Sequence, residues 1–248
     1  MTPSLLNITP ELIASVAAKT VAAQALLAEI AGDWSPATFA NSLGAEDMVL
    51  TDLIAKFNAK CSTNSPANLI EIFSLDTGRL PLETYDLMAA VDQHYGLKLK
   101  VYFPQSEGVE KYVRAHGINA FYESIELRKG CCYVRKVEPL QRALAGKKAW
   151  ITGLRAQQAS TRSGLPTREF DAGNKLEKFN PLADWSEKEV WTYIKQNGVP
   201  YNALHDKFYP SIGCAPCTRA ISLGEDVRSG RWWWESPELK ECGLHVKE

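Results

Sequence analysis

The sequence predicts an α/β protein with a doubly wound, mainly parallel sheet. Apolar stretches of strand length alternate along the chain with stretches in which apolar residues recur at helical spacing. Such chains bury the sheet between helices and bind ligands beyond the carboxyl ends of the strands. The 248 residues, 45% hydrophobic and 23% charged, are enough to bury a core of ordinary size. We therefore expect a single domain over residues 1–248.

The first expected element is an amphipathic helix over residues 10–31. Thr9 is suited to cap this helix, Pro10 to occupy its first position and Gly32 to follow its end. The stretch is apolar, but polar side chains interrupt it and no basic segment precedes it, unlike a secretory signal. No other stretch approaches the length of a membrane span, which predicts a cytoplasmic protein with no membrane segment.

Strands and helices are then expected to alternate as far as about residue 200. We expect strands at residues 38–43, 69–75, 97–103 and 149–153, with helices at residues 48–57 and 82–94. The loops that follow these strands are the expected binding sites, because ligands of open parallel sheets bind there.

Two of these loops have the composition of anion sites. Residues 42–47 lead a strand into a helix, where backbone amides and the helix dipole can hold a phosphate. A plain tight turn explains this loop equally well. Residues 152–162 are more specific, because Arg155 and Arg162 flank amide and hydroxyl side chains and the arginine fork suits sulfate or phosphate oxygens. An ordinary solvated loop is the alternative.

Cysteine spacing predicts a thiolate-bound metal centre. Cys131 and Cys132 are adjacent, which is awkward for one zinc ion, but neighbouring thiolates can serve different irons of a larger cluster. Cys214 and Cys217 complete a set of four. Iron–sulfur ligation is the leading interpretation, structural zinc the second and a dithiol redox pair the third, since residues 201–213 predict a loop rather than a thioredoxin-like βαβ unit.

Local cations accompany these cysteines although the net charge of the chain is only -1. That net charge argues against binding to nucleic acid or membranes through bulk positive charge. Arg135 and Lys136 follow the adjacent pair and would offset the charge of a thiolate cluster. Six cysteines in a chain of this length do not form the disulfide scaffold of a small secreted domain.

The remaining two cysteines differ in their surroundings. Cys242 has His245 three residues later and Arg228 and Arg231 upstream, and a nucleophilic thiol needs such partners to ionise. A stray surface cysteine is the alternative. Cys61, placed in a polar loop, is expected to be incidental. The tryptophans at residues 232–234 are expected to pack at a domain seam rather than to stack on bases, since no basic stripe accompanies them.

Together these residues resemble those of the assimilatory adenylyl-sulfate (APS) reductases, which are relatives of the phosphoadenylyl-sulfate (PAPS) reductases. The resemblance extends from about Thr38 to His245. The motifs that carry it are SLGAED at residues 42–47, LDTGR at 75–79, CCYVRK at 131–136, ITGLR at 151–155, GCAPCT at 213–218 and ECGLH at 241–245. Four cysteines in this pattern distinguish the cluster-containing APS enzymes. Many relatives have Arg and Ser where this chain has Ala156 and Ala159.

The resemblance implies an adenine nucleotide α-hydrolase-like fold with a nucleotide-binding core over about residues 36–200. Residues 201–248 would then form the cluster-bearing and mobile catalytic segment. A 4Fe-4S cluster is implied on Cys131, Cys132, Cys214 and Cys217. The implied catalytic residues are Cys242, Lys136 and His245. The implied substrate-binding residues are Ser42, Leu43, Gly44, Asp47, Asp76, Thr77, Gly78, Arg155, Gln158, Arg162, Arg228 and Arg231.

The implied activity is thioredoxin-dependent reduction of APS to sulfite and AMP through an S-sulfocysteine on Cys242, in sulfate assimilation towards cysteine. PAPS reduction or dual activity is the nearer alternative. A pyrophosphatase-type thiolation enzyme would need ATP, Mg²⁺ and a Ser-Gly-Gly-x-Asp-Ser loop, and a nucleotide-binding regulator with structural zinc is a further alternative. The sequence leaves open the oligomeric state, a homo-oligomer included, and the identity of the thioredoxin.

Overall fold

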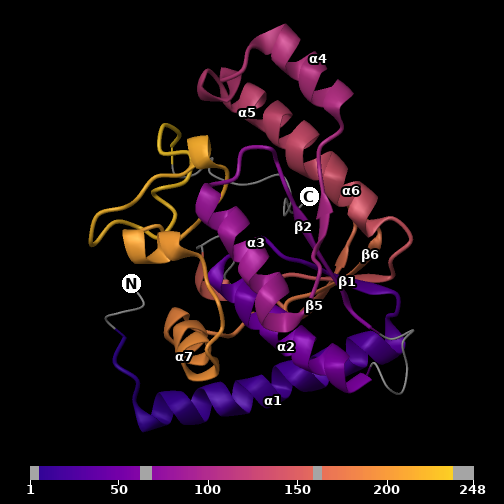
Figure 1. Ribbon diagram of the computed structural model, residues 1–248, viewed down its shortest axis with the longest axis vertical. Coiled ribbons are helices and arrows are strands. Elements are labelled where there is room, and N and C mark those ends of the chain that lie inside the picture. The colour runs from indigo at the N-terminus through magenta and orange to yellow at the C-terminus, as the bar shows by residue number, and fades with distance from the viewer. Residues whose placement is uncertain (1–5, 62–68, 159–163, 237–248) are drawn as a thin grey trace.

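A six-stranded sheet forms the centre of the computed structural model, which describes residues 6–61, 69–158 and 164–236 (Figure 1). The strand order is β3-β2-β1-β4-β6-β5; neighbours are parallel except for β5, which pairs antiparallel with β6 at the edge. The strands are β1 Ala37–Ala40, β2 Glu71–Leu75, β3 Lys100–Tyr102, β4 Ala149–Ile151, β5 Arg168–Asp171 and β6 Leu176–Phe179. The predicted mainly parallel α/β class is confirmed.

Seven α-helices are assigned within the described residues. They are α1 Pro10–Asp33, α2 Ala45–Cys61, α3 Leu82–Tyr95, α4 Ser106–His116, α5 Ile125–Cys132, α6 Glu138–Leu144 and α7 Glu187–Asn197. A π-helical turn, Tyr133–Val137, joins α5 to α6, so the two helices and the turn run on without a break. Helices α4 and α5 lie at one end of the molecule, opposite to α1 (Figure 1).

Both faces of the sheet are buried. In β4, Ala149 and Ile151 point into a core shared with α1, α2 and α7. Trp150, between them, points to the opposite face and packs with Leu140 and Leu144 of α6. Successive side chains of a strand alternate between faces, so a strand covered on both sides must be apolar throughout. The central strand β4, Ala-Trp-Ile, is accordingly buried and apolar throughout, whereas the edge strands β3 and β5 are partly exposed and carry charged residues.

The topology places a binding crevice between β1 and β4. From β1 the chain moves outward through β2 to β3, and it then returns to the other side of β1 to form β4. At such a switch point the loops beyond two neighbouring strands diverge and leave a crevice at their carboxyl ends. The loops that follow β1 and β4 are the two that the sequence predicted as anion sites.

Several element boundaries differ from the expected ones. Strand β1 ends at Ala40 rather than at residue 43, because Leu43 adopts a left-handed conformation with φ of 64°. Helix α1 has the predicted cap, with the Leu12 amide donating to Thr9 Oγ1 at 3.3 Å, but the helix continues through Gly32 to Asp33. Cys61 is the last residue of α2 and does not lie in a loop. Helices α4 to α7 and the β5–β6 hairpin were not among the expected elements.

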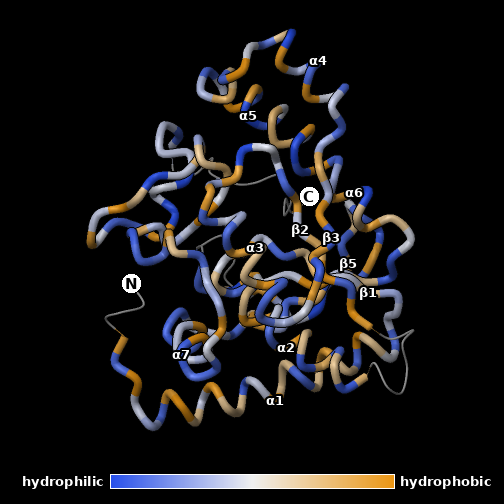
Figure 2. The backbone as a smooth tube through the Cα atoms, viewed as in Figure 1, coloured by the Kyte–Doolittle hydropathy of each residue, from blue (hydrophilic) through white to orange (hydrophobic). Residues whose placement is uncertain are grey.

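Helix α1 is long and apolar enough to cross a membrane by length and composition alone. In the fold one side of the helix, including Leu27 and Ile30, is buried in the main core. Ser15 and Lys19 on the same helix contact Glu189 of α7 at 2.5 and 2.9 Å. Hydrophilic and hydrophobic residues alternate along the helix (Figure 2). These contacts are those of an amphipathic helix that covers a protein core.

A buried carboxylate joins three of the helices. Asp52 of α2 is 2% exposed and accepts hydrogen bonds from Tyr193 of α7 at 2.6 Å and from Tyr95 of α3 at 3.3 Å. Lys56 contacts the same carboxylate at 2.7 Å. Burial, together with the nearby Asp52 charge, raises the pKa of both tyrosines above the usual value, so both hydroxyls remain protonated donors.

We predict that Tyr193→Phe lowers the free energy of unfolding by about 2 kcal/mol, because it removes a short hydrogen bond to a charged acceptor. Tyr95→Phe is the matched control, since its bond to Asp52 is longer and a smaller loss is expected. Urea denaturation of both variants provides the comparison. If Tyr95→Phe lowers the free energy of unfolding as much as Tyr193→Phe or more, the shorter bond is not the stronger one.

Candidate active site

The main cavity has a volume of about 290 Å³ and lies at the switch point between β1 and β4. Its walls come from the loops after β1, β2 and β4, from the π-helical turn, and from residues 210–213 and 227–232. Predicted site residues that line this cavity are Ser42, Gly44, Asp47, Thr77, Lys136, Arg155, Gln158, Arg228 and Arg231. The fold thus brings together polar residues that are far apart in the sequence.

The loop after β1 is held by its own side chains. Asn41 Oδ1 accepts a hydrogen bond from the Leu43 amide at 2.7 Å, which stabilises the turn. The Leu43 side chain is buried in the core, so only its backbone can contribute to a binding site. Asp47 Oδ2 accepts hydrogen bonds from the amide and the hydroxyl of Ser42, both at 2.6 Å. The Ser42 donors, which the sequence assigned to a phosphate, are therefore engaged by the Asp47 carboxylate.

Asp47 also contacts the loop after β4, at Gly153. Its side chain is 7% exposed, and burial raises its pKa to about 7 in spite of the hydrogen bonds from Ser42. A Cβ atom on Gly153 would lie 2.0 Å from Asp47 Oδ1, so only glycine fits at that position. The sequence marked Asp47 as a ligand residue, but it did not indicate this contact with Gly153.

Arg155, on the loop after β4, is paired with a carboxylate inside the protein. Its Nη2 lies 2.7 Å and its Nε 2.8 Å from Glu46 Oε1, and its Nη1 donates to the carbonyl of Trp185 at 3.2 Å. Burial opposes the ionisation of Glu46, but the Arg155 charge, together with hydrogen bonds from the backbone, Arg155 and Gln158, holds the pKa of Glu46 below its usual value. Glu46 was not among the predicted site residues, because an acidic residue in the first turn of a helix is already explained by the helix dipole.

The loop after β2 connects the main cavity to the cysteines. Asp76 accepts hydrogen bonds from the Gly78 amide at 2.7 Å and from Tyr85 at 3.0 Å, and it thereby shapes the loop. Gly78 has a φ of 69°, which favours glycine. Thr77 Oγ1 lies 3.3 Å from Cys214 Sγ, within hydrogen-bonding distance for a sulfur acceptor. Asp76 and Gly78 shape this loop, whereas Thr77 lines the cavity itself.

A second cavity gathers the four predicted ligand cysteines. It is lined by Cys131, Cys132, Cys214 and Cys217 together with Arg79, Phe121, Arg128, Arg135, Lys136 and Pro216. The π-helical turn directly follows Cys132 and carries Arg135 and Lys136. Turns of this kind are rare and often occur at functional sites. Lys136 lines both cavities, so one cationic residue is shared by the thiol cavity and the main pocket.

The thiols interact electrostatically with one another and with the cations. Burial raises the pKa of Cys217 to about 12, with further contributions from Cys214 and Cys132. Burial also opposes ionisation of Cys214, but Lys136, the Thr77 hydroxyl and Arg231 outweigh it and lower the pKa of Cys214. A positively charged metal centre would favour the thiolate form of all four cysteines.

The donor set around the second cavity consists of four thiols. Across residues 6–61, 69–158 and 164–236, no three His, Cys, Asp or Glu side chains converge closely enough to form a group for one metal ion. Adjacent cysteines such as Cys131 and Cys132 can serve different irons of a cluster, which spreads its cysteine ligands over several irons. Four thiols around one cavity, with cations beside them, are compatible with the larger group.

Arg231 lines the main cavity, as do Arg228 and Lys136. It is 8% exposed, and its Nη1 makes long contacts of 3.3 Å to the Ile212 carbonyl and 3.5 Å to Ser211 Oγ. Within the described part of the chain its Nε has no hydrogen-bond partner. A buried guanidinium whose donors are incompletely satisfied is suited to bind an anion.

Comparisons with known proteins agree with this arrangement. A family model described as the phosphoadenosine phosphosulfate reductase domain matches residues 36–220. The chain belongs to this family. The adenosine 5'-phosphosulfate reductase of Allochromatium vinosum is 55% identical to it, over 93% of this chain and 86% of the relative. The enzyme of the same name from Burkholderia cepacia is 52% identical, over 96% of this chain and 90% of the relative.

Solved structures show the same fold for the reductase family. The crystal structure of the PAPS reductase of Candida auris, in a phosphate complex, is 28% identical with a TM-score of 0.66, and the match covers 87% of this chain and 99% of that one. Yeast FAD synthetase, in complex with FAD, is 17% identical with a TM-score of 0.58 and shares the fold alone. The predicted family and its adenine nucleotide α-hydrolase-like fold are confirmed.

Three of the residues expected from the reductase family lie outside the described residues. These are Arg162, Cys242 and His245, and their roles stay predictions.

The tryptophans at residues 232–234 differ in burial. Trp232 is 1% exposed and packs with Phe121 and Cys217, whereas Trp233 is 40% exposed.

We predict that Gly153→Ala displaces Asp47 and loosens the loop after β1, because the added methyl group has no room. The free energy of unfolding should fall by about 1–3 kcal/mol, as for other overpacked sites. Native-state hydrogen exchange should also show reduced protection of the Ser42 amide, which donates a hydrogen bond to Asp47. Gly108→Ala is the control, since nothing lies within 4 Å of its added Cβ. Unchanged protection of Ser42 would contradict the prediction.

Proposed function

We propose that this protein reduces adenylyl sulfate to sulfite and AMP, as an oxidoreductase acting on a sulfur group in assimilatory sulfate reduction. The observation that carries the proposal is that Lys136 lines both the main cavity and the cavity of the four thiols. The relatives named adenosine 5'-phosphosulfate reductase, at 55% and 52% identity, support this substrate; the PAPS reductase of Candida auris is 28% identical.

The charge distribution of the main cavity suits the substrate. Adenylyl sulfate is a mixed anhydride of AMP and sulfate, so its reacting end carries negative charge. Lys136, Arg228 and Arg231 line this cavity, where they would bind the phosphate and sulfate oxygens. Since an attacking thiolate is also anionic, these cations would reduce the repulsion between nucleophile and substrate in the transition state.

Cys131, Cys132, Cys214 and Cys217 would hold the 4Fe-4S cluster that we propose as the cofactor. When bound, the cluster supplies a fixed negative charge beside the cations rather than electrons for the reduction. Lys136 and Arg135 lie next to these thiols and would partly offset that charge. Because Lys136 faces both cavities, it would hold its ammonium group at the end of the pocket where the sulfate binds.

Cys242 is the proposed nucleophile. Its thiolate would attack the sulfur of the substrate, forming an S–S bond as the S–O bond to AMP breaks and AMP leaves. One thiolate of reduced thioredoxin would then attack Cys242 Sγ and release sulfite, and the second thiol would resolve the mixed disulfide. Thioredoxin is oxidised to its disulfide and supplies both electrons. We propose His245 as a partner of the thiolate and a cytoplasmic location, where thiols remain reduced.

We predict that Cys242→Ser forms no covalent adduct with ³⁵S-labelled adenylyl sulfate and loses at least about 10³-fold in sulfite release, because the attacking thiolate is absent. Cys61→Ser, at the end of α2, is the control and should retain both properties. The labelled adduct is measured after a single turnover without thioredoxin. Sulfite is measured in the presence of thioredoxin. A stable labelled adduct on Cys242→Ser would exclude this nucleophile.

We predict that protein purified without oxygen is brown and contains about four iron and four sulfide per chain. Cys132→Ser should lose the colour and the iron together, whereas Cys61→Ser should keep both. Iron, zinc and acid-labile sulfide analyses test the prediction. A colourless protein with one zinc per chain would instead support the structural-zinc alternative.

A further inference from the structure

A fully buried ion pair joins α5 to the end of the described chain. Arg128 is 0% exposed, and its Nε and Nη2 lie 2.7 and 2.8 Å from Oε1 and Oε2 of Glu235. The Glu235 side chain is 4% exposed. Both carboxylate oxygens are thus engaged by one guanidinium, an arrangement that fixes the orientation of each group as well as their distance.

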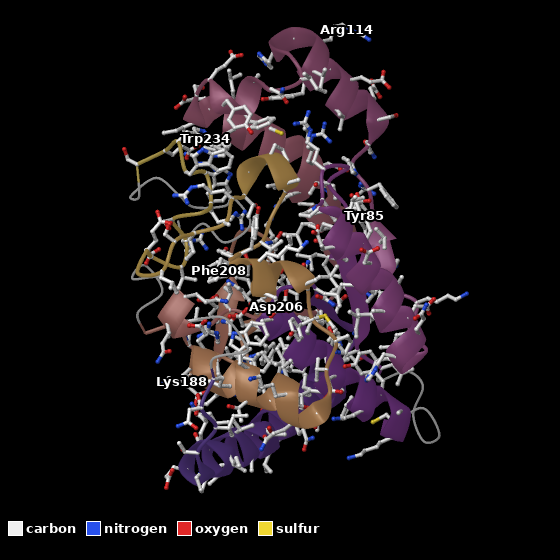
Figure 3. The ribbon with its side chains drawn as sticks, turned by 60° about the vertical axis from the view of Figure 1, so that its left-hand side comes forward. Tyr85, Arg114, Lys188, Asp206, Phe208 and Trp234 are labelled. Atoms are coloured by element: carbon white, nitrogen blue, oxygen red, sulfur yellow. The ribbon has the colours of Figure 1, made fainter. Side chains whose placement is uncertain are left out.

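Aromatic contacts hold the same segment against α5. The Arg128 guanidinium lies 4.5 Å from the ring centre of Trp232. Trp234 contacts Tyr122 with ring centres 4.5 Å apart and Phe121 with ring centres 6.3 Å apart. Trp234 lies on the C-terminal segment, towards the end of the molecule that carries Arg114 of α4 (Figure 3). Trp232 and Glu235 therefore contact the helix that carries the first cysteine pair, and Trp234 packs on residues 120–122, which precede that helix.

The two partners lie close in sequence to the two reactive parts of the proposed mechanism. Arg128 precedes Cys131 by three residues and itself lines the cysteine cavity. Glu235 precedes Cys242 by seven residues. Seven residues span at most about 25 Å, so the position of Glu235 limits the region that the Cys242 thiol can reach. The ion pair therefore holds Glu235, seven residues before Cys242, beside the thiol cavity that Arg128 lines.

We propose that Arg128 is a positioning residue for sulfur transfer. Its bidentate pair with Glu235 fixes the point from which the segment carrying Cys242 continues, and thereby the approach of that thiol to the main cavity. This inference rests on the proposed role of Cys242. A buried ion pair is weak evidence for stabilisation, since apolar replacements of similar size are often as stable. The directional geometry of the pair is what apolar residues would not reproduce.

The test uses the double variant Arg128→Met/Glu235→Gln, which removes both charges and leaves neither one buried alone. We expect its melting temperature, its iron content and its KM for adenylyl sulfate to match those of the parent chain. The single-turnover rate of adduct formation on Cys242 should fall about tenfold, which corresponds to about 1.4 kcal/mol in the barrier. The matched control is Arg219→Met/Glu225→Gln, an exposed pair in the same part of the chain, which should keep the parent rate.

Each outcome decides the question. A double variant that is folded and iron-loaded, and that forms the adduct at the parent rate, overturns the inference; so does a rate that falls only in proportion to lost iron. If the double variant does not fold, Glu235→Asp keeps the charge but moves the carboxylate by one methylene. Slower adduct formation in that variant supports the inference, and the parent rate overturns it. Absence of any adduct on the parent chain would instead refute the proposed role of Cys242.

Discussion

The contact between the loop after β2 and the Cys-x-x-Cys segment is the constraint on which the site depends. Thr77 Oγ1 lies 3.3 Å from Cys214 Sγ, and the Ala215 amide donates to the Arg79 carbonyl at 2.8 Å. These bonds attach a segment more than a hundred residues later in the chain to the end of a central strand. They help to fix the cysteine cavity relative to the main cavity, and Lys136 lines both.

The charges of the site come from local groups and not from the net charge of the chain, which is only -1. Carboxylates hold the loops from within, since Glu46 pairs with Arg155 and Asp47 with the donors of Ser42. Lys136 and Arg231 add positive charge to the lining of the same cavity. A cavity of limited size can hold both signs of charge only if each group has a fixed partner, because buried unpaired charges are costly.

Periodicity and loop composition predicted the α/β class, the central strands and the two loops at the switch point, because these depend on local sequence. The cysteine spacing identified four residues that line one cavity. Element ends were less predictable, as β1 shows: a left-handed Leu43 ends the strand early, and nothing in the residue type requires that conformation. The contacts of Asp47 with Gly153 and of Glu46 with Arg155 were missed, since each connects loops that meet only after the sheet has formed.

The sequence by itself determined which chemical groups the protein contains: four paired thiols, a terminal thiol and arginines beside strand ends. Residue types and short spacings carry that information, because they act within a turn or a helix. The tertiary structure alone decided which groups face each other. Arg128 meets Glu235 across 107 residues and Arg155 meets Glu46 across 109. Pairings of that kind depend on the strand order and on the closure of a common core, and no local pattern specifies them.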